Sequence, residues 1–245
     1  LIQKEMKDGN RVVYIRDGAI HTLMGGIETF IANVADIPVT YGGKAVCNIE
    51  NSLAAVSALL ALGLPAERVR EGITSFMPDT VSNPGRFNIF DMGSFTVMLD
   101  YGHNTAGYRA VIDMLRRCQA SVYTGVIGMP GDRRDMSIKE VGRLCGQFFS
   151  KLYIKEDSDL RGREEGEVAD ILFKGAISGG ADKSRVTVIH QEAVALETAI
   201  MEAVPGEMIV MFYEELEPAL AVIDKYRRLH GFDRCDGNGI TTEKQ

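Results

Sequence analysis

Three segments of the sequence concentrate Asp, Arg, His and Gly, the residue types that bind phosphates and charged amino acids. They read DYGHN (100–104), GMPGDRRD (128–135) and KEDSDLRGR (155–163). Guanidinium groups match phosphate and carboxylate oxygens, and carboxylates accept hydrogen bonds from hydroxyl and amino groups. One such segment alone says little, because solvated loops collect the same residues. Each of the three follows an apolar, strand-like run, however, and together they indicate one binding site.

Those strand-like runs belong to a regular alternation of strands and helices. Strands are expected at 96–100, 122–127, 151–155, 186–189 and 208–212, with a further strand near 87–91. Apolar residues at helical spacing predict helices over 108–115, 138–148, 196–203 and 216–223, and Ser137 with Glu140 predicts a capping box on the second of these. Such alternation requires right-handed crossovers and a mostly parallel sheet. The sequence therefore predicts a Rossmann-like α/β domain with its ligands at the carboxyl ends of the strands, where the three segments lie.

The first third of the chain has a different pattern. Asp17-Gly18 between two short runs, 11–16 and 19–23, predicts a hairpin. A helix is expected from Asn51 to Leu62, and Pro65 opens a second helix that carries Val69, Ile73 and Phe76. Pro78 and Pro84 bracket a polar stretch typical of a domain boundary. We therefore expect domains at 1–83 and 84–231, followed by a polar tail at 232–245.

Composition excludes several function classes. The 245 residues carry a formal net charge of −7, which repels a phosphate backbone and argues against a nucleic-acid partner. No apolar run approaches the roughly 20 residues that span a bilayer. The four cysteines (47, 118, 145 and 235) show no zinc or disulfide spacing. Glycines 125, 128 and 131 are spaced GxxGxxG, which does not match a dinucleotide-binding loop.

Five strings in order carry a resemblance to a known family. They are NIENSLAA (48–55), NPGRFN (83–88) and the three segments above. Together they resemble the Mur ligase superfamily, and within it the cyanophycin synthetases, over about 37–229. The sequence departs from the pattern at Gly102 and Thr105, where the family usually has Ala and Pro, and it contains no GxxxxGK[ST] phosphate-binding loop; Gly43-Lys44-Ala45 is the nearest approach. The resemblance thus implies the tail end of a central ATP-binding domain (1–83) followed by the C-terminal Rossmann-like domain (84–231), in a fragment that also lacks the family's ATP-grasp domain.

The resemblance implies a nucleotide side of the site. Asn48 and Asn51 would face the adenine, Arg86 would act as the catalytic group on the ATP phosphates, and Asp100 would accept hydrogen bonds from the ribose. His103 and Asn104 would lie beside them. Other interpretations stay open: either of the first two asparagines can cap a helix, Asn104 can cap the next one, and Arg86 can form a surface salt bridge.

The resemblance places the acceptor amino acid at the other two segments. These would contribute the following residues: Asp132, Arg133, Arg134, Asp159, Arg161 and Arg163. For Arg163, a solvated charge run with Glu164 and Glu165 is the alternative.

The activity implied is ATP-dependent amide bond formation in the cytoplasm, adding arginine to the side chains of an aspartate polymer through an acyl phosphate. ATP and Mg²⁺ would be required, with the metal ligands mostly outside this chain and no metal site within it. A homo-oligomer is expected, and the isolated chain is expected to be inactive. Two alternatives remain: another Mur-type ligase, such as a folylpolyglutamate or peptidoglycan-precursor synthetase, and a non-catalytic Rossmann-like binding module.

Overall fold

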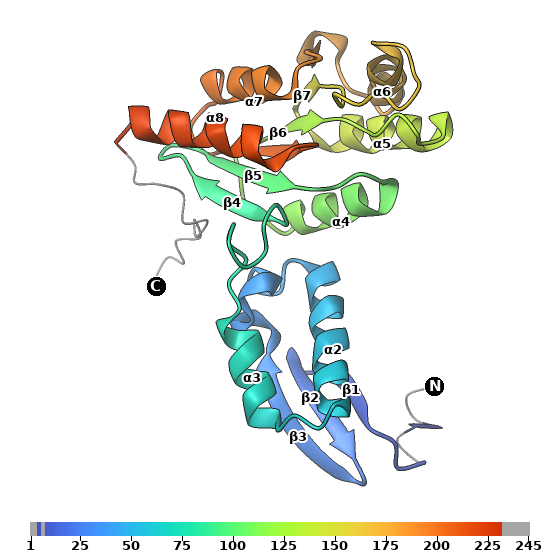
Figure 1. Cartoon of the computed structure of the whole chain (residues 1–245), viewed down its shortest axis with the longest axis vertical. Helices are drawn as coiled ribbons and strands as arrows, with labels where there is room; N and C mark the ends of the chain where they lie inside the picture. The colour runs from blue at the N-terminus through green and yellow to red at the C-terminus, as the bar shows by residue number, and fades with distance from the viewer. Residues whose placement is uncertain (1–3, 6–7, 232–245) are drawn as a thin grey trace. The chain divides into compact units, whose positions relative to one another are not determined.

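The structure, a computed structural model, describes residues 4–5 and 8–231 and divides into two compact units (Figure 1). Of the described residues, the first unit comprises those up to Met77 together with Asp113–Cys118, and the second comprises Pro78–Ile112 and those from Gln119 to Gly231. The division thus follows Met77, a few residues before the predicted position after Asn83. The predicted polar tail at 232–245 and Cys235 lie outside the described residues. Within the described part, no helix is long and apolar enough to cross a membrane, and Cys47, Cys118 and Cys145 form no disulfide.

The first unit begins with the predicted hairpin. Strands β1 (Val12–Arg16) and β2 (Ala19–Met24) pair antiparallel, and Asp17 and Gly18 both adopt positive φ, at 50° and 75°. Both values suit the two-residue turn that joins right-twisted strands, so the hairpin prediction is confirmed. Strand β3 (Ile27–Asn33) pairs with β2 and was not predicted, because its buried residues do not alternate regularly.

Two helices pack on this sheet. They are α2 (Val46–Ala61) and α3 (Ala66–Ser75), preceded by the short 3-10 turns η1 (Val34–Asp36) and η2 (Pro38–Thr40). Their core with the sheet includes Ile20, Ile31, Val56 and Val69. The prediction that the first helix begins at Asn51 is wrong: α2 begins at Val46, after Ala45, whose side chain cannot signal a cap. The second helix ends before Phe76, which is extended and 43% exposed.

The second unit is built on a six-stranded sheet. In spatial order its strands are β4 (Asn88–Asp91), β5 (Thr96–Asp100), β9 (Glu207–Phe212), β6 (Val122–Ile127), β7 (Lys151–Ile154) and β8 (Val186–Val188). Only β4 runs antiparallel to its neighbour; the remaining pairs are parallel. The predicted Rossmann-like, mostly parallel sheet is therefore confirmed.

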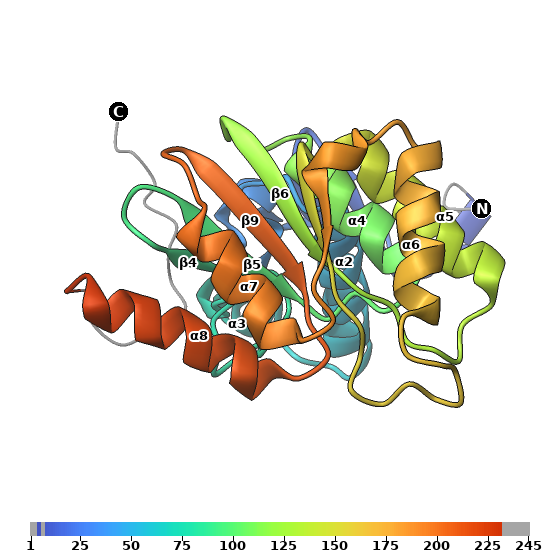
Figure 2. The ribbon, with the colours of Figure 1, turned by 90° about the horizontal axis from the view of Figure 1, so that it is seen from above.

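Helices cover both faces of this sheet (Figure 2). They are α4 (Thr105–Leu115), α5 (Asp135–Phe148), α6 (Glu167–Ser178), α7 (Glu192–Met201) and α8 (Leu216–Leu229), with a 3-10 turn η3 (Lys183–Arg185) before β8. Helices α7 and α8 bury Ala195, Ile200 and Ile223 against one face, whereas α4 and α5 lie on the other. On that second face the Tyr108 ring of α4 stacks on Phe212 of β9, with ring centroids 3.7 Å apart.

Two details of the helices differ from the sequence prediction. Helix α6 was not predicted, because its buried side includes Gly175 and Ala176, which add little to an apolar pattern. The predicted capping box of Ser137 and Glu140 is wrong, since α5 begins at Asp135 and Ser137 lies inside the helix. The Glu140 carboxylate instead accepts two hydrogen bonds from the Arg143 guanidinium, at 2.7 and 2.8 Å.

Candidate functional site

The loops that carry the predicted site residues of the second unit meet at one edge of its sheet. Parallel strands β5, β6 and β7 end toward the same edge, which is where Asp100, Asp132 and Asp159 follow them. Direct contacts join the loops: Arg133 Nε donates to the His103 carbonyl oxygen at 3.3 Å, and Arg161 Nη1 lies 2.9 Å from Asp132 Oδ2. The expectation that the three segments form one rim is confirmed.

The buried side chain of Asn88 holds the NPGRFN segment in place through hydrogen bonds to its backbone. The Asn88 Oδ1 atom accepts a hydrogen bond from the Gly85 amide at 2.6 Å, and Nδ2 donates to the carbonyl oxygens of Pro78 and Asn83 at 2.9 and 3.1 Å. Gly85 also has a positive φ, and a Cβ there would overlap the Tyr213 hydroxyl. The backbone on either side of Arg86 is therefore held in one conformation, a role for Asn88 and Tyr213 that was not predicted from the sequence.

Arg86 itself is exposed. Its guanidinium lies over the Tyr101 ring, 5.2 Å from the ring centroid, and Nη1 is 3.5 Å from the Tyr101 carbonyl oxygen. Among the residues that the structure describes, no carboxylate forms an ion pair with it, so the surface salt bridge is not observed. A cation held by an aromatic face and a carbonyl keeps most of its donors available to an anion.

Asp100 lies beneath this arrangement rather than on the surface. It is 3% exposed, and its Oδ2 accepts a hydrogen bond from the Phe87 amide at 3.2 Å. Burial raises the pKa of this carboxyl group to about 6, while the Phe87 amide and the Arg86 charge oppose the shift. The resemblance implies that Asp100 accepts hydrogen bonds from a ribose; in the structure its carboxylate accepts one from the Phe87 amide, in the segment that carries Arg86.

The two residues after Gly102 immediately precede α4. Asn104 Oδ1 accepts a hydrogen bond from the Gly107 amide at 2.9 Å, so the alternative that Asn104 caps the helix is confirmed. His103 Nδ1 lies 3.1 Å from the Tyr101 carbonyl oxygen, and the two rings are 5.2 Å apart. His103 and Arg86 thus both lie against Tyr101.

In the second and third segments, Arg163 joins two loops. Its side chain is 15% exposed, and it donates to the carbonyl oxygens of Gly131 and Arg133 at 2.6 and 2.8 Å. It also pairs with Asp135 at 2.7 Å and Glu167 at 2.6 Å. All three guanidinium nitrogens are engaged, so the alternative of a solvated charge run is wrong. Arg134 and Asp132, in contrast, are exposed on the rim.

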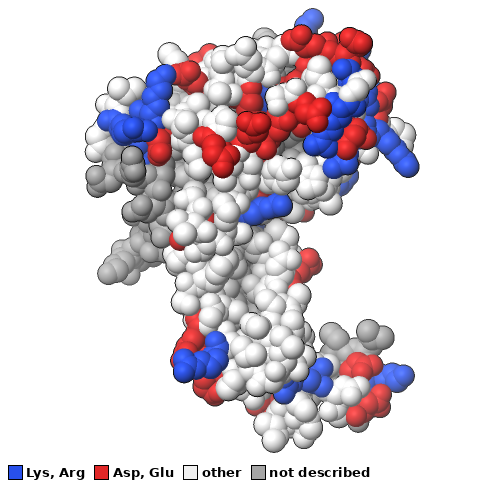
Figure 3. Space-filling view, viewed as in Figure 1, with Lys and Arg blue, Asp and Glu red and all other residues white. Residues whose placement is uncertain are grey.

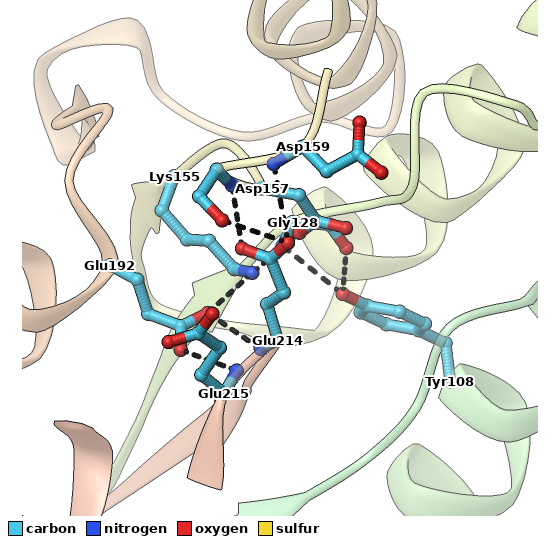
Figure 4. Close-up of polar contacts among 9 residues, drawn as sticks. Tyr108, Gly128, Lys155, Asp157, Asp159, Glu192, Glu214 and Glu215 are labelled. Atoms are coloured by element: carbon cyan, nitrogen blue, oxygen red, sulfur yellow. Dashed lines mark hydrogen bonds and ion pairs between the residues drawn. The ribbon is translucent and has the colours of Figure 1, made fainter. Parts of the chain in front are cut away.

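A polar cluster next to these loops was not predicted from the sequence (Figure 4). Lys155 is 1% exposed, and its ammonium lies 2.8 Å from Asp157 Oδ1 and 2.6 Å from Glu192 Oε2. On the face shown in Figure 3, acidic side chains gather in a band on the second unit, with basic side chains at its right-hand end and again at the left edge of the unit. The sequence did contain one signal for this cluster: Lys155 ends the apolar run KLYIK, and a buried lysine is expected only where its charge is paired.

Glu156 closes the base of the third segment. Its carboxylate accepts hydrogen bonds from the amides of Gly166 and Ala169 at 2.7 and 3.0 Å, and it lies 2.7 Å from His190 Nδ1. Burial opposes ionisation of Glu156, but these donors outweigh burial and lower its pKa. The chain on both sides of the loop is thereby tied to one carboxylate.

The predicted adenine contacts lie in the first unit, on α2. Asn48 Nδ2 donates to the Val39 carbonyl oxygen at 2.7 Å, and Asn51 is exposed with its Nδ2 3.4 Å from Asn48 Oδ1. Neither residue caps the helix, because both lie inside it. Within the described ranges, no group of three or more His, Cys, Asp or Glu side chains could hold a metal ion.

Comparison with known proteins agrees with the fold and the motifs. The family model described as Mur ligase, glutamate ligase domain, matches residues 85–212. Cyanophycin synthetases from Geminocystis herdmanii and a Synechocystis species are 36% and 35% identical over 92% and 91% of this chain. The chain spans about a quarter of the length of these relatives, 26% and 25%.

A solved structure shows the same fold at lower sequence identity. E. coli FolC in complex with ADP is 17% identical and aligns with a TM-score of 0.62, over 90% of this chain and 47% of that one. The matched region 85–212 contains Arg86, Asp100 and all three rim segments. This chain therefore belongs to the Mur ligase family.

Proposed function

We propose that the chain is the C-terminal part of the Mur-ligase-like portion of an ATP-dependent ligase of the cyanophycin synthetase type. The observation that carries the proposal is the placement of Arg86. An exposed guanidinium without a described carboxylate partner sits on a braced segment, at the edge of the sheet where two Arg-rich loops also end. The similarity to cyanophycin synthetases over 92% of the chain supports the same assignment.

The proposed reaction adds arginine to the side-chain carboxylates of an aspartate polymer. The carboxylate oxygen attacks the γ-phosphorus of ATP, the bond to the β-phosphate oxygen breaks, and ADP leaves. The arginine amine then attacks the acyl carbon, the C–O bond to phosphate breaks, and the amine loses a proton as the amide forms. Negative charge moves through the phosphoryl group in the first step, and the Arg86 guanidinium stabilises it there.

The remaining residues have graded roles in this proposal. Arg133, Arg134, Asp132, Asp159 and Arg161 lie at the acceptor side, whereas Arg163 positions their loops. Asn48 and Asn51 face the adenine. Asp100 acts through the Phe87 amide to position Arg86, with His103 and Asn104 beside it. Mg²⁺ neutralises phosphate charge when bound, and we propose that its ligands come from outside this chain. The enzyme would work in the cytoplasm as a homo-oligomer.

Arg86 provides the test of this proposal in the complete natural protein. We expect Arg86→Ala to lower kcat for arginine addition by about 10²-fold or more, the scale of losing one preorganised electrostatic group. The KM for ATP should change far less, because the contact strengthens as charge moves. Arg86→Lys should recover only part of the rate, because an ammonium lacks the planar fork.

The matched control is Arg68→Ala, which removes an exposed arginine of α3 that pairs with Glu71. Steady-state rates of aspartate and arginine addition should be measured separately for all four proteins. Arginine addition at the normal rate in Arg86→Ala would reduce Arg86 to a surface residue and leave the NPGR string as a domain hinge.

A second candidate is another Mur-type ligase, which the fold similarity to FolC favours. Supplying the complete protein with ATP and different acceptors separates the two, since the proposed activity consumes arginine and aspartate together. Failure of every acceptor would favour a non-catalytic binding module.

A further inference from the structure

The buried Lys155 belongs to a closed ring of polar contacts at the edge of the sheet (Figure 4). Its ammonium bridges Asp157 and Glu192. The Glu192 carboxylate also accepts hydrogen bonds from the backbone amides of Glu214 and Glu215, at 2.7 and 3.2 Å. The ring therefore connects the residue after β7 to the start of α7 and to the residues that follow β9.

The Glu214 side chain closes the ring, because it contacts the residues that follow Asp157. The Glu214 carboxylate accepts hydrogen bonds from the amides of Ser158 and Asp159, at 2.6 and 3.4 Å, and from the Ser158 hydroxyl at 3.3 Å. These residues directly follow Asp157, the first partner of Lys155. We call residues 157–166, from Asp157 to Gly166, the acceptor loop. Its first three residues are thus held on one side by Lys155 and on the other by Glu214.

Lys155 occupies a position that tolerates little movement. A Cβ at Gly128 would overlap its side-chain carbons, so the lysine stem lies directly against that backbone. The Gly128 amide and carbonyl are themselves bonded to the Tyr108 hydroxyl, at 3.2 and 2.6 Å. Burial alone would lower the pKa of Lys155, but the Glu192 and Asp157 charges outweigh it and raise the pKa. The ammonium is therefore a fixed positive charge between carboxylates that would otherwise repel one another.

We propose that Lys155 is a positioning residue for the acceptor loop, which it fixes through Asp157 and through Glu192 and Glu214. It has no role as a substrate contact, because it is buried and both of its carboxylate partners are protein groups. The proposal rests on the proposed function for the meaning of the loop, which contributes Asp159 and Arg161 to the acceptor side. The ring itself depends only on the contacts described above.

The first arm of the test measures amide hydrogen exchange in the complete natural protein without substrates. In Lys155→Met, the Ser158 and Asp159 amides should exchange about 10-fold faster or more, because their bonds to Glu214 loosen. Glu214→Ala should produce the same change. Its control is Glu215→Ala, which removes the same charge from the next residue but keeps the backbone amide that donates a hydrogen bond to Glu192. In this variant the Ser158 and Asp159 amides should exchange at the normal rate. Lys174→Met, an exposed lysine of α6, controls for loss of a positive charge.

The second arm measures ligation. Lys155→Met and Glu214→Ala should raise the KM for the acceptor amino acid by about 10-fold or more and leave the KM for ATP within about twofold. A lysine with a merely structural role would lower the amount of folded enzyme and leave both KM values unchanged. If Lys155→Met does not fold, Glu192→Gln, which keeps the shape but removes one charge opposite Lys155, is judged by the same criteria.

The two arms separate the failure of each proposal. Normal exchange at Ser158 and Asp159 in Lys155→Met, or an equal increase throughout α7 and α8, would overturn the positioning role. Faster exchange in the loop with an unchanged acceptor KM would overturn it as well. A wild-type protein that ligates no acceptor would instead refute the proposed function, while the exchange arm still decides whether Lys155 holds the loop.

Discussion

Asp100 shows how one buried carboxyl group links the stability of the protein to the placement of Arg86. Its carboxylate accepts a hydrogen bond from the amide of Phe87, which adopts a φ of 55°. A non-glycine residue in the left-handed region is unfavourable and persists where its surroundings hold it. Burial removes water that would compete for this hydrogen bond, but it also makes the ionised carboxylate unfavourable. Ionised Asp100 therefore lowers the stability of the fold while it helps to fix the position of the neighbouring guanidinium.

This cost predicts a pH-dependent effect of Asp100→Asn. The pKa is about 6 in the folded protein and 3.8 in the reference state, so the folded protein binds the proton more tightly and loses stability as the pH rises from about 4 to about 6. The asparagine variant lacks this loss. We expect it to match the wild type near pH 4 and to exceed it above pH 6 by at most about 3 kcal/mol.

The measurement is urea unfolding of both proteins at a series of pH values, with Asp170→Asn as an exposed control on α6. A stability difference that stays constant from pH 4 to pH 8 would show that Asp100 does not titrate in this range.

Among the elements, α5 and α6 form an unusually close pair. Helix α5 contains Gly142 and Gly146, and α6 contains Gly175 and is capped by Gly179. A Cβ at any of these four positions would overlap the backbone of the other helix. Helix α6 begins directly after the acceptor loop. The close packing of the two helices therefore also sets where that loop ends.

A comparison of Gly146 in α5 with Gly72 in α3 should distinguish the effect of close packing on stability from the effect of helix propensity. Gly146→Ala places a methyl group against the Ala176 backbone, so we expect it to destabilise the protein by about 1–3 kcal/mol, the usual cost of overpacking. Gly72→Ala in α3 has open space at the Cβ position and should instead stabilise the protein by about 0.5–1 kcal/mol. Chemical denaturation of the three proteins compares them, and equal effects of the two substitutions would contradict the close approach of α5 and α6.

At the scale of the whole molecule, the residues that we propose for nucleotide binding belong to both units. Asn48 and Asn51 belong to the first, and Arg86 and Asp100 to the second. The 245 residues contain no GK[ST] string to hold phosphates. Catalysis of phosphoryl transfer depends on positioning and on charge neutralisation around those phosphates. Arg86 alone would supply only part of that machinery.

We therefore expect the purified 245-residue chain to hydrolyse no ATP and to join no amino acids. The assay is phosphate release with ATP, aspartate and arginine against a matched blank. Release above the blank that disappears in Arg86→Ala would show that the chain is catalytic by itself, and the proposed division of the site would have to be abandoned.

Local patterns in the sequence were sufficient for the hairpin, the strands of the second unit and the edge at which its loops meet. Asp17-Gly18 determines a turn through its own backbone preferences, and a buried parallel strand such as 208–212 is apolar throughout. Helix α6 was not predicted because Gly175 and Ala176 bury little apolar surface, although they allow the backbones of α5 and α6 to approach closely. Patterns of this kind report burial averaged over a few residues.

The tertiary structure decided what each polar side chain faces. Asp100 turns inward to the Phe87 amide, Arg163 engages two loops, and Lys155 pairs with Glu192 and not only with its sequence neighbour Asp157. The spacing of residues along the chain does not specify such pairs, because they depend on strand order and on the depth at which each loop packs. The residue type alone does not distinguish a solvated charge from a charge that is paired in the interior. Only the three-dimensional surroundings, through desolvation and the nearest opposite charge, separate a residue that binds a ligand from one that holds the site in place.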